Sequence, residues 1–323
     1  MPFKIVGKTD KGRRRSRNED AYLIMESIGL CSVADGMGGH YGGNIASSIA
    51  VQILSEIFTQ TYNPNGNEQE LLTFLKETIS KGNMEIYERN KQDMFPSGMG
   101  TTIVALLLKE PKVFLGFVGD SRIYLYRDKK LAQVSEDHSL VAELIRNGII
   151  SKNEAMYHQN KNIITRALGM NEDLQVDGKI LDLQEGDVFL LCSDGLSDLI
   201  PEVEMENILE RYVQDLEGAV NYMVDQANNA GGFDNITVVL ALYSKNLPPS
   251  TSLGPRSSIL IDEETTTIDL ATLQEVAQDM KLSLHPNTGK TPSELTPPAF
   301  PEVPKDSSTF NSSAPDSLPP KEK

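Results

Sequence analysis

The feature that most restricts the fold of this chain is a set of four aspartates at the ends of apolar, strand-like segments. Asp35 follows LCSVA, Asp120 follows FVG, Asp194 follows LLCS, and Asp234 stands just before NITVVLAL. Each aspartate alone is an ordinary turn residue or helix N-cap. Several unpaired carboxylates at buried strand ends are costly unless cations neutralise them. The pattern therefore predicts that these strand ends meet at a cation site.

The chemistry of the carboxylates indicates which cations would fit. All-oxygen ligands suit Mg²⁺ or Mn²⁺, and a carboxylate that bridges two such ions, about 3.5–4 Å apart, suits phosphoryl chemistry. The formal net charge of −16 agrees with carboxylates collected for cations. It argues against a surface for nucleic acid or anionic membrane, because both select for clustered Lys and Arg.

Periodicity predicts a mixed α+β chain. Apolar residues at helical spacing favour helices over 45–58 and 68–89, after a hairpin of two strands. Four short β-rich segments then read as one antiparallel meander. Strands and helices in separate runs indicate sheets sandwiched between helical layers. The expected strands are 21–25, 28–34, 101–108, 112–118, 121–127, 130–135, 174–183, 187–192 and 235–243, and the later helices are 140–147 and others within 201–229.

Composition changes near residue 247. The remaining segment holds 12 of the 17 prolines and is rich in Ser and Thr. Such a segment buries too little apolar surface to fold. We therefore expect a folded domain at 1–246 and a mostly disordered acidic tail at 247–323, with a short helix at 268–282 where apolar residues share one helical face.

The cysteines and apolar runs bear on the compartment. Cys31 and Cys192 each lie inside an apolar run without a spaced framework, which is typical of buried thiols in a reducing compartment. No apolar run has the length of a signal peptide or the ~18 residues of a membrane span. A cytoplasmic protein without membrane contact is the expectation.

Seven segments in order carry a resemblance to a known family. They are RRSRNED at 14–20, VADGMGGHYGG at 33–43, GMGTT at 98–102, FVGDSRIYLYRD at 117–128, EDHSL at 136–140, LLCSDGLSD at 190–198 and GGFDNITVV at 231–239. The chain resembles, from about residue 5 to 243, the bacterial metal-dependent Ser/Thr protein phosphatases of the PPM (type 2C) family. The resemblance implies a four-layer α-β-β-α sandwich with two central antiparallel sheets, outer helices on both faces, and a binuclear Mn²⁺/Mg²⁺ site at one end.

The resemblance also implies roles for individual residues. Asp35 would bridge both metals and the Gly36 carbonyl would bind the second. Asp194 and Asp234 would complete the shell of the first metal, and Asp120 would help Asp194 to hold a third, weaker one. Glu19 and Asp20 would act through metal-bound water, as acceptors that orient it. The glycines after Asp35 would let backbone and phosphate approach closely.

Arg15 matches the phosphate-binding arginine of the family, and its planar fork suits a phosphomonoester dianion. The alternative is that Arg15 belongs to a solvated basic cluster with its neighbours at 13, 14 and 17. The implied mechanism is in-line attack on phosphorus by a water that bridges the two metals. A cysteine phosphatase is excluded, because Cys-x5-Arg is absent: Asp198 stands six residues after Cys192, and Met37 after Cys31.

One position departs from the eukaryotic pattern. Met37 stands where eukaryotic members carry a histidine proposed to protonate the leaving oxygen; bacterial relatives share this substitution. The proton would then come from metal-bound water or from another group such as His40, a candidate general acid; the alternative for His40 is a packed or solvated loop histidine. His138, beside Asp137, is expected to order its loop. Residues 147–169 correspond to the mobile flap that would lie beside the cleft.

Two classes of function stay open: an active phosphatase, and a non-catalytic phosphoprotein-binding module on the same fold. Retention of Asp35, Asp194 and Asp234 favours the enzyme. Expected partners are phosphorylated Ser/Thr proteins and their kinases, a specific regulator such as an anti-sigma-factor antagonist, and a protein that binds the tail. A phosphatase of small metabolites also remains open. The threonines of DEETTTID resemble phosphothreonine sites read by forkhead-associated domains, with an unmodified linker as the alternative. The family expectation is a monomer.

Overall fold

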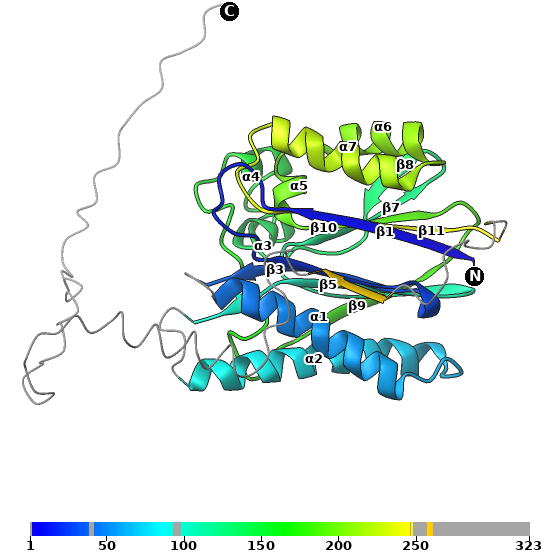
Figure 1. Cartoon of the computed structure of the whole chain (residues 1–323). Coiled ribbons are helices and arrows are strands. Elements are labelled where there is room, and N and C mark those ends of the chain that lie inside the picture. The colour runs from blue at the N-terminus through cyan, green and yellow to red at the C-terminus, as the bar shows by residue number, and fades with distance from the viewer. Residues whose placement is uncertain (1, 39–41, 93–97, 246, 248–256, 261–323) are drawn as a thin grey trace, which may run out of the picture. The chain divides into compact units, whose positions relative to one another are not determined.

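The computed structural model of the chain describes residues 2–38, 42–92, 98–245, 247 and 257–260. Two antiparallel sheets lie face to face between two pairs of helices (Figure 1). Helices α1 (Gly42–Thr61) and α2 (Glu68–Lys91) cover one sheet, and α6 (Glu202–Tyr212) and α7 (Leu216–Asn229) cover the other. The expected α-β-β-α sandwich is therefore confirmed.

The first sheet has five strands in the order β1-β11-β10-β7-β8 and the second has the order β12-β2-β3-β5-β6-β9, with β4 paired to β3. The strands of the first sheet are β1 (Phe3–Asp10), β7 (Arg122–Arg127), β8 (Lys130–Gln133), β10 (Val188–Cys192) and β11 (Ile236–Tyr243). Those of the second are β2 (Asp20–Met25), β3 (Leu30–Met37), β4 (Gly100–Thr101), β5 (Ile103–Lys109), β6 (Lys112–Val118), β9 (Asp177–Asp182) and β12 (Ser257–Leu260).

Central strands are apolar on both faces because both faces are covered. In β10, Phe189 and Leu191 pack into the layer between the sheets, while Leu190 and Cys192 pack against α6 and α7. This alternation with period two explains why such strands read as continuous apolar runs. Cys31 lies in the layer between the sheets, and both thiols are free and buried, as expected.

Helix boundaries follow local signals. Asn67 caps α2 through a capping box, in which its side chain accepts from the Glu70 N–H and the Glu70 carboxylate accepts from the Asn67 N–H. The shorter helices are η1 (Glu26–Ile28), α3 (Leu140–Arg146), α4 (Lys152–Met156) and α5 (Asp194–Ser197).

The expected four-strand meander is wrong in one respect. β5 pairs with β6 and β7 pairs with β8, but β6 belongs to the second sheet and β7 to the first. The chain crosses between sheets at Gly119, which has a φ of 103°. A Cβ at this glycine would meet the side chain of Thr102, so both conformation and space require glycine. The crossing places Asp120 between the two sheets rather than in a hairpin turn.

Two strands were not anticipated from the sequence. β1 pairs with β11 over eight residues, and β12 pairs with β2 within the segment that we expected to be mostly disordered. Apart from β12 and residue 247, the tail lies outside the described residues, as does the expected helix at 268–282. The domain boundary at 246 therefore stays a prediction.

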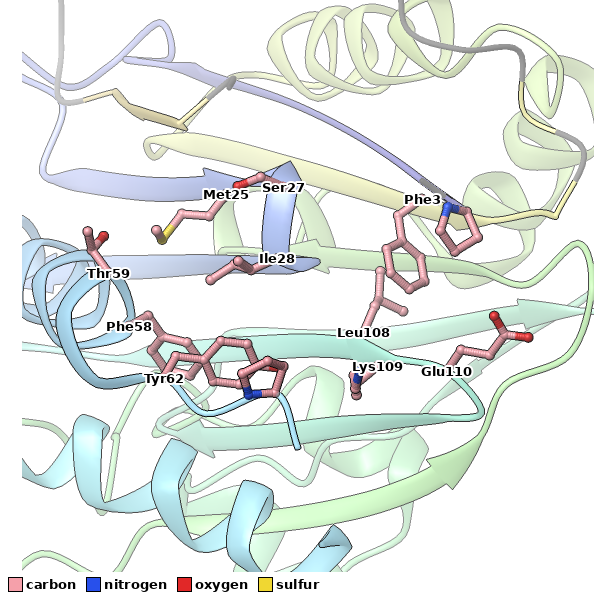
Figure 2. A pocket seen from close by; sticks show the side chains of 12 residues that line it. Phe3, Met25, Ser27, Ile28, Phe58, Thr59, Tyr62, Leu108, Lys109 and Glu110 are labelled. Atoms are coloured by element: carbon pink, nitrogen blue, oxygen red, sulfur yellow. The ribbon is translucent and has the colours of Figure 1, made fainter. Parts of the chain in front are cut away.

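An apolar pocket opens at the end of the sandwich where β2 finishes (Figure 2). Met25, Ile28, Phe58 and Leu108 are among the residues that line it. The other end of β2 begins at Asp20, so this pocket lies away from the sequence-predicted carboxylates. Within the part of the chain that the structure describes, no helix has the length and apolar character needed to cross a membrane.

Candidate active site

Two neighbouring strands begin and end at the predicted site. β2 starts at Asp20, and its antiparallel pairing with β3 places Asp20 directly opposite Asp35. The backbone of Asp35 is fixed by Thr102, whose Oγ1 accepts from the Asp35 N–H at 3.1 Å and whose N–H donates to the Asp35 carbonyl at 2.9 Å. The apolar strands therefore act as rigid supports that bring these two carboxylates together.

Asp20 is buried with a partly satisfied carboxylate. The residue is 1% exposed, and its Oδ2 accepts from Ser193 Oγ at 2.7 Å and Thr237 Oγ1 at 2.6 Å. Its Oδ1 is buried and has no hydrogen-bond partner. Burial, opposed by these two hydrogen bonds, raises the pKa of Asp20 to about 7. One carboxylate oxygen is therefore held in place and the other is left for a ligand.

Asp120 and Asp194 also have a carboxylate oxygen that lacks a hydrogen-bond partner; in each residue it is the buried Oδ1. Burial first, and then repulsion from Asp194, raise the pKa of Asp120 to about 7. Burial, followed by repulsion from Asp234 and Asp198, raises the pKa of Asp194 to about 6. Asp194 begins α5, directly after strand β10.

The Asp35 carboxylate is repelled by all the other aspartates of the cluster. Burial raises its pKa, and the carboxylates of Asp20, Asp194, Asp120 and Asp234 raise it further. Five acidic side chains from five different parts of the chain thus act on one another at one end of the sandwich. Strongly raised carboxyl pKa values in a cluster are typical of sites that hold a cation or perform acid–base chemistry.

These residues fit the chemistry of a divalent cation. Three buried carboxylate oxygens that lack a hydrogen-bond partner, on Asp20, Asp120 and Asp194, are what Mg²⁺ or Mn²⁺ would coordinate or orient through water. Among the described residues, however, no three Asp, Glu, His or Cys side chains are already gathered closely enough to hold a metal ion.

Asp234 is neutralised by an arginine instead. Arg15 Nη2 donates to Asp234 Oδ2 at 2.6 Å, and the two side chains are 52% and 34% exposed. Asp234 Oδ1 also accepts from the Asn235 N–H at 2.8 Å. The predicted phosphate-binding arginine and one predicted metal ligand are therefore in direct contact at the open side of the site.

The glycines after Asp35 allow close approach of the backbone. A Cβ on Gly36 would collide with the carbonyl oxygens of Gly43 and Glu19. The Gly36 N–H donates to the Glu19 carbonyl at 3.2 Å, which fixes the end of β3 against the segment before β2. Burial raises the pKa of the Glu19 carboxyl, while Arg15 opposes that shift. Gly36 and Glu19 therefore lie beside the aspartates; the metal-binding roles that the family resemblance implies for them stay predictions.

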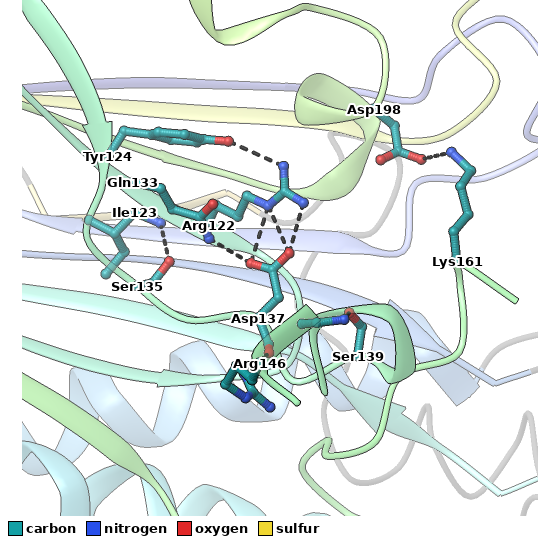
Figure 3. A network of polar contacts seen from close by, with 11 residues as sticks. Arg122, Ile123, Tyr124, Gln133, Ser135, Asp137, Ser139, Arg146, Lys161 and Asp198 are labelled. Carbon is teal, nitrogen blue, oxygen red and sulfur yellow. Dashed lines mark hydrogen bonds and ion pairs between the residues drawn. The ribbon is translucent and has the colours of Figure 1, made fainter. Parts of the chain in front are cut away.

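The loop after β8 is hydrogen-bonded to Gly119, the residue before Asp120. His138 holds Gly119 by two hydrogen bonds: Nδ1 accepts from the Gly119 N–H at 3.1 Å, and the His138 N–H donates to the Gly119 carbonyl at 2.8 Å. Asp137 accepts from Arg122 Nε and Nη2 and from Gln133 Nε2 (Figure 3). These contacts agree with the expectation that His138 orders its loop.

The stretch predicted to form a flap contacts the site's border. Lys161 Nζ lies 2.7 Å from Asp198 Oδ2 (Figure 3), and Asp198 is one of the groups that raise the pKa of Asp194. His40, the candidate general acid, lies outside the described residues, so its role stays a prediction.

Three supporting residues were missed by sequence reasoning. Ser193 and Thr237 hold Asp20. Asn235 holds the loop between β1 and β2 at three points: its Oδ1 accepts from the Glu19 N–H, and its Nδ2 donates to the carbonyls of Lys11 and Arg17. Each stands within three residues of a predicted aspartate, at 194 or 234. Polar residues next to strand-ending aspartates were the available signal.

Comparison with known proteins places this geometry in a family. Residues 9–228 match the family model for protein phosphatase 2C. The serine/threonine phosphatase stp of Listeria monocytogenes is 44% identical over 236 residues, which cover 72% of this chain and 93% of that protein. Relatives of this kind are phosphatases by name, so the non-catalytic alternative finds no support.

Solved structures agree. The serine/threonine phosphatase of S. agalactiae is 35% identical, with a TM-score of 0.70 over 75% of this chain and 100% of that chain. The catalytic domain of the phosphatase PstP in complex with two manganese ions is 31% identical, with a TM-score of 0.67 over 75% of this chain and 99% of that chain. The chain therefore belongs to the protein phosphatase 2C family of metal-dependent enzymes and is a serine/threonine protein phosphatase.

Proposed function

We propose that this chain hydrolyses phosphoserine and phosphothreonine in proteins at a site for two Mn²⁺ or Mg²⁺ ions built on Asp35, the Gly36 carbonyl, Asp194 and Asp234. The observation that supports this proposal most strongly is the set of buried carboxylate oxygens without partners at the ends of β2, β6 and β10. A cation would remove both the desolvation cost and the mutual repulsion of these groups.

The remaining acidic residues would have secondary roles. Asp120 and Asp194 would hold a third, weaker ion, and Glu19 and Asp20 would orient water on the metals. Asp20 suits this role because Ser193 and Thr237 fix one of its oxygens. When bound, the ions supply positive charge to the phosphoryl oxygens and a water poised for in-line attack.

Arg15 would bind the phosphate. In the described structure it pairs with Asp234, so a cation on Asp234 would compete with this ion pair. Release would leave a half-exposed guanidinium beside the ions, and its fork matches two phosphoryl oxygens. The ion pair would therefore keep Arg15 and Asp234 close together until Arg15 binds phosphate and Asp234 binds a metal ion.

The substrate class is a phosphorylated protein, and the enzyme would reverse the action of Ser/Thr kinases as a cytoplasmic monomer. A more specific substrate, such as a phosphorylated anti-sigma-factor antagonist, is a narrower form of the same proposal. The metal site would contact only the phosphate group of a substrate. An activity assay is therefore needed to distinguish a small phosphorylated metabolite from a phosphoprotein as the substrate.

Release of phosphate from a phosphothreonine peptide tests the proposal, with Mn²⁺, with Mg²⁺ and with EDTA. We expect turnover with metal and none with EDTA. Arg15→Ala should raise KM and lower kcat/KM by roughly tenfold to a hundredfold, because a charged hydrogen bond contributes about 1.5–3 kcal/mol. Arg13→Ala is the matched control from the same exposed loop. Absence of turnover with either metal, on peptide and on an aryl phosphate, would refute the proposal.

A further inference from the structure

His138 is a buried histidine with both ring nitrogens engaged. The residue is 2% exposed, and its ring stacks on that of Phe117, with the ring centres 5.9 Å apart. Nδ1 accepts from the Gly119 N–H at 3.1 Å, so the proton of the neutral ring lies on Nε2. Nε2 is 3.0 Å from Asp177 Oδ2 and therefore donates to it. One imidazole thus connects the Gly119 backbone to a carboxylate on β9.

Asp177 and Arg166 fix this ring from its other side. Asp177 is the first residue of β9, and its Oδ2 also accepts from Arg166 Nη1 at 3.1 Å. Arg166 Nη1 lies 3.4 Å from His138 Nε2, as expected when two donors share one acceptor oxygen. Although burial raises it, the hydrogen bond from His138 and the charge of Arg166 lower the pKa of Asp177. The carboxylate therefore stays charged and accepts from both donors.

The charge state of His138 suits this arrangement. Burial, followed by repulsion from Arg166, lowers the pKa of the His138 ring, while Asp177 opposes the shift. The ring is therefore neutral at neutral pH and keeps a lone pair on Nδ1. A protonated ring would carry a hydrogen on Nδ1 and could not accept from the Gly119 N–H.

Gly119 is held on both of its peptide groups. Its N–H belongs to the peptide group shared with Val118, and its carbonyl, which accepts from the His138 N–H at 2.8 Å, belongs to the one shared with Asp120. Gly119 has a φ of 103°, which glycine adopts readily and other residues rarely do. Asp120 Oδ1 is buried without a hydrogen-bond partner. The direction of this oxygen therefore depends on the backbone that His138 fixes.

Backbone contacts place Arg166 beside the same loop. The Thr165 N–H donates to the His138 carbonyl at 2.8 Å, and the Leu140 N–H donates to the Ile163 carbonyl at 2.9 Å. The residue before Arg166 is thus bonded to the histidine whose ring the arginine helps to orient. Side-chain and backbone contacts agree in tying this segment to the Gly119 backbone.

We propose that Arg166, Asp177 and His138 are positioning residues for the cation site, an inference that rests on the proposed function. Arg166 orients Asp177, Asp177 holds the His138 ring, and the ring fixes Gly119. Through Gly119 they keep the Asp120 carboxylate in the orientation that the third, weaker ion requires. Removal of supports that orient metal ligands typically lowers metal affinity by roughly tenfold to a hundredfold.

Calorimetric titration of the full, metal-free chain with Mn²⁺ tests the inference through affinity rather than turnover. We expect the parent chain to bind two ions tightly and a third weakly. His138→Leu should weaken the third step by about tenfold and leave the first two within about twofold of the parent. His138→Asn should recover most of the loss, because its amide oxygen can accept from the Gly119 N–H near the position of Nδ1.

Arg166→Gln tests the outer end of the connection. The Arg166 side chain is 32% exposed, so we expect this variant to fold. It should weaken the third step by about threefold, and it should add no further loss to His138→Leu, which has already broken the connection. Asp187→Asn is the matched control, because it disrupts a buried ion pair with Arg127 and so lowers stability at a different place. Its third step should equal that of the parent chain.

The outcomes separate the two proposals. If His138→Leu is destabilised like Asp187→Asn but keeps the third Mn²⁺ step, the inference is wrong and the proposed function stands. Additive losses in the double variant, or a parent chain that binds only two ions, would also overturn it. If His138→Leu does not fold, an unchanged third step in Arg166→Gln overturns it. If the parent chain hydrolyses neither a phosphothreonine peptide nor an aryl phosphate with Mn²⁺, the proposed function fails and the inference fails with it.

Discussion

The two ends of strand β10 place a buried aspartate in opposite situations. Asp187 stands just before the strand and is 1% exposed; its carboxylate accepts from Arg127 Nε at 2.7 Å and Nη2 at 2.6 Å, and from the Gln184 N–H at 2.8 Å. Asp194 stands just after the strand and has a buried oxygen with no hydrogen-bond partner. Two aspartates that flank the same strand thus differ in whether the fold provides hydrogen-bond partners for the carboxylate.

This difference agrees with the proposed assignment of Asp187 as a structural carboxylate and of Asp194 as a metal ligand. Removing a charge from a satisfied buried pair leaves the partner unpaired and costs stability. Removing a charge from a cluster of unpaired carboxylates relieves the repulsion among them, and we expect it to weaken binding of the proposed cation. Matched asparagine variants at the two ends of β10 therefore test the proposed assignment directly.

The largest expected effect is on turnover. Asp194→Asn should lower kcat/KM on a phosphothreonine peptide with Mn²⁺ by at least about a hundredfold, the scale on which loss of one electrostatic contributor acts. Asp187→Asn, assayed well below its melting temperature, should stay within about twofold of the parent chain. Comparable losses in both variants would show that Asp194 has no special role.

The second effect is stabilisation by metal. Mn²⁺ at about 100 times its dissociation constant should stabilise the parent chain and the Asp187→Asn variant by about 2.7 kcal/mol, because it binds only the folded state. Asp194→Asn should lose most of this gain. Thermal unfolding with increasing Mn²⁺ measures it, and a full metal-dependent shift in Asp194→Asn would argue against coordination there.

The third effect has opposite signs at the two ends. In chelator at pH 8, Asp187→Asn should lower the free energy of unfolding by about 2 kcal/mol, because Arg127 loses its charged partner. Asp194→Asn should raise it by on the order of 1 kcal/mol, because a buried charge is removed and, with it, the repulsion from Asp234. Chemical denaturation of both variants gives the signs, and the same sign in both would contradict the comparison.

The smallest effect is a pH dependence of the metal-free chain. The pKa values of Asp20 and Asp120 rise to about 7 and that of Asp194 to about 6, above an unfolded value near 3.8. The folded state then binds more protons between about pH 4 and pH 7, so its stability should fall as pH rises through this range. Mn²⁺ should oppose the fall, because metal binding displaces those protons. A melting temperature in EDTA that rises from pH 5 to 7 would contradict this account.

Much of the site could be read from the sequence because its chemistry is local to short segments. A carboxylate at the end of an apolar run is visible without knowing which strands are neighbours, and Asp35, Asp120, Asp194 and Asp234 were found in this way. The supports of Asp20 were harder to foresee. Ser193 directly follows β10 and Thr237 lies in β11, both strands of the other sheet, and nothing in their own segments shows that Asp20 contacts both.

The sequence by itself determined the α+β class, most strand and helix boundaries, and the acidic residues that meet at one end of the sandwich, because alternation, helical spacing and strand-end carboxylates are properties of neighbouring residues. Only the tertiary structure decided which sheet each strand joins. It split the expected meander at Gly119, paired β1 with β11, and placed β12 beside β2. Strand pairing depends on burying both faces of each sheet at once. This burial requires contacts between segments that are far apart in the chain, so it cannot be read from neighbouring residues.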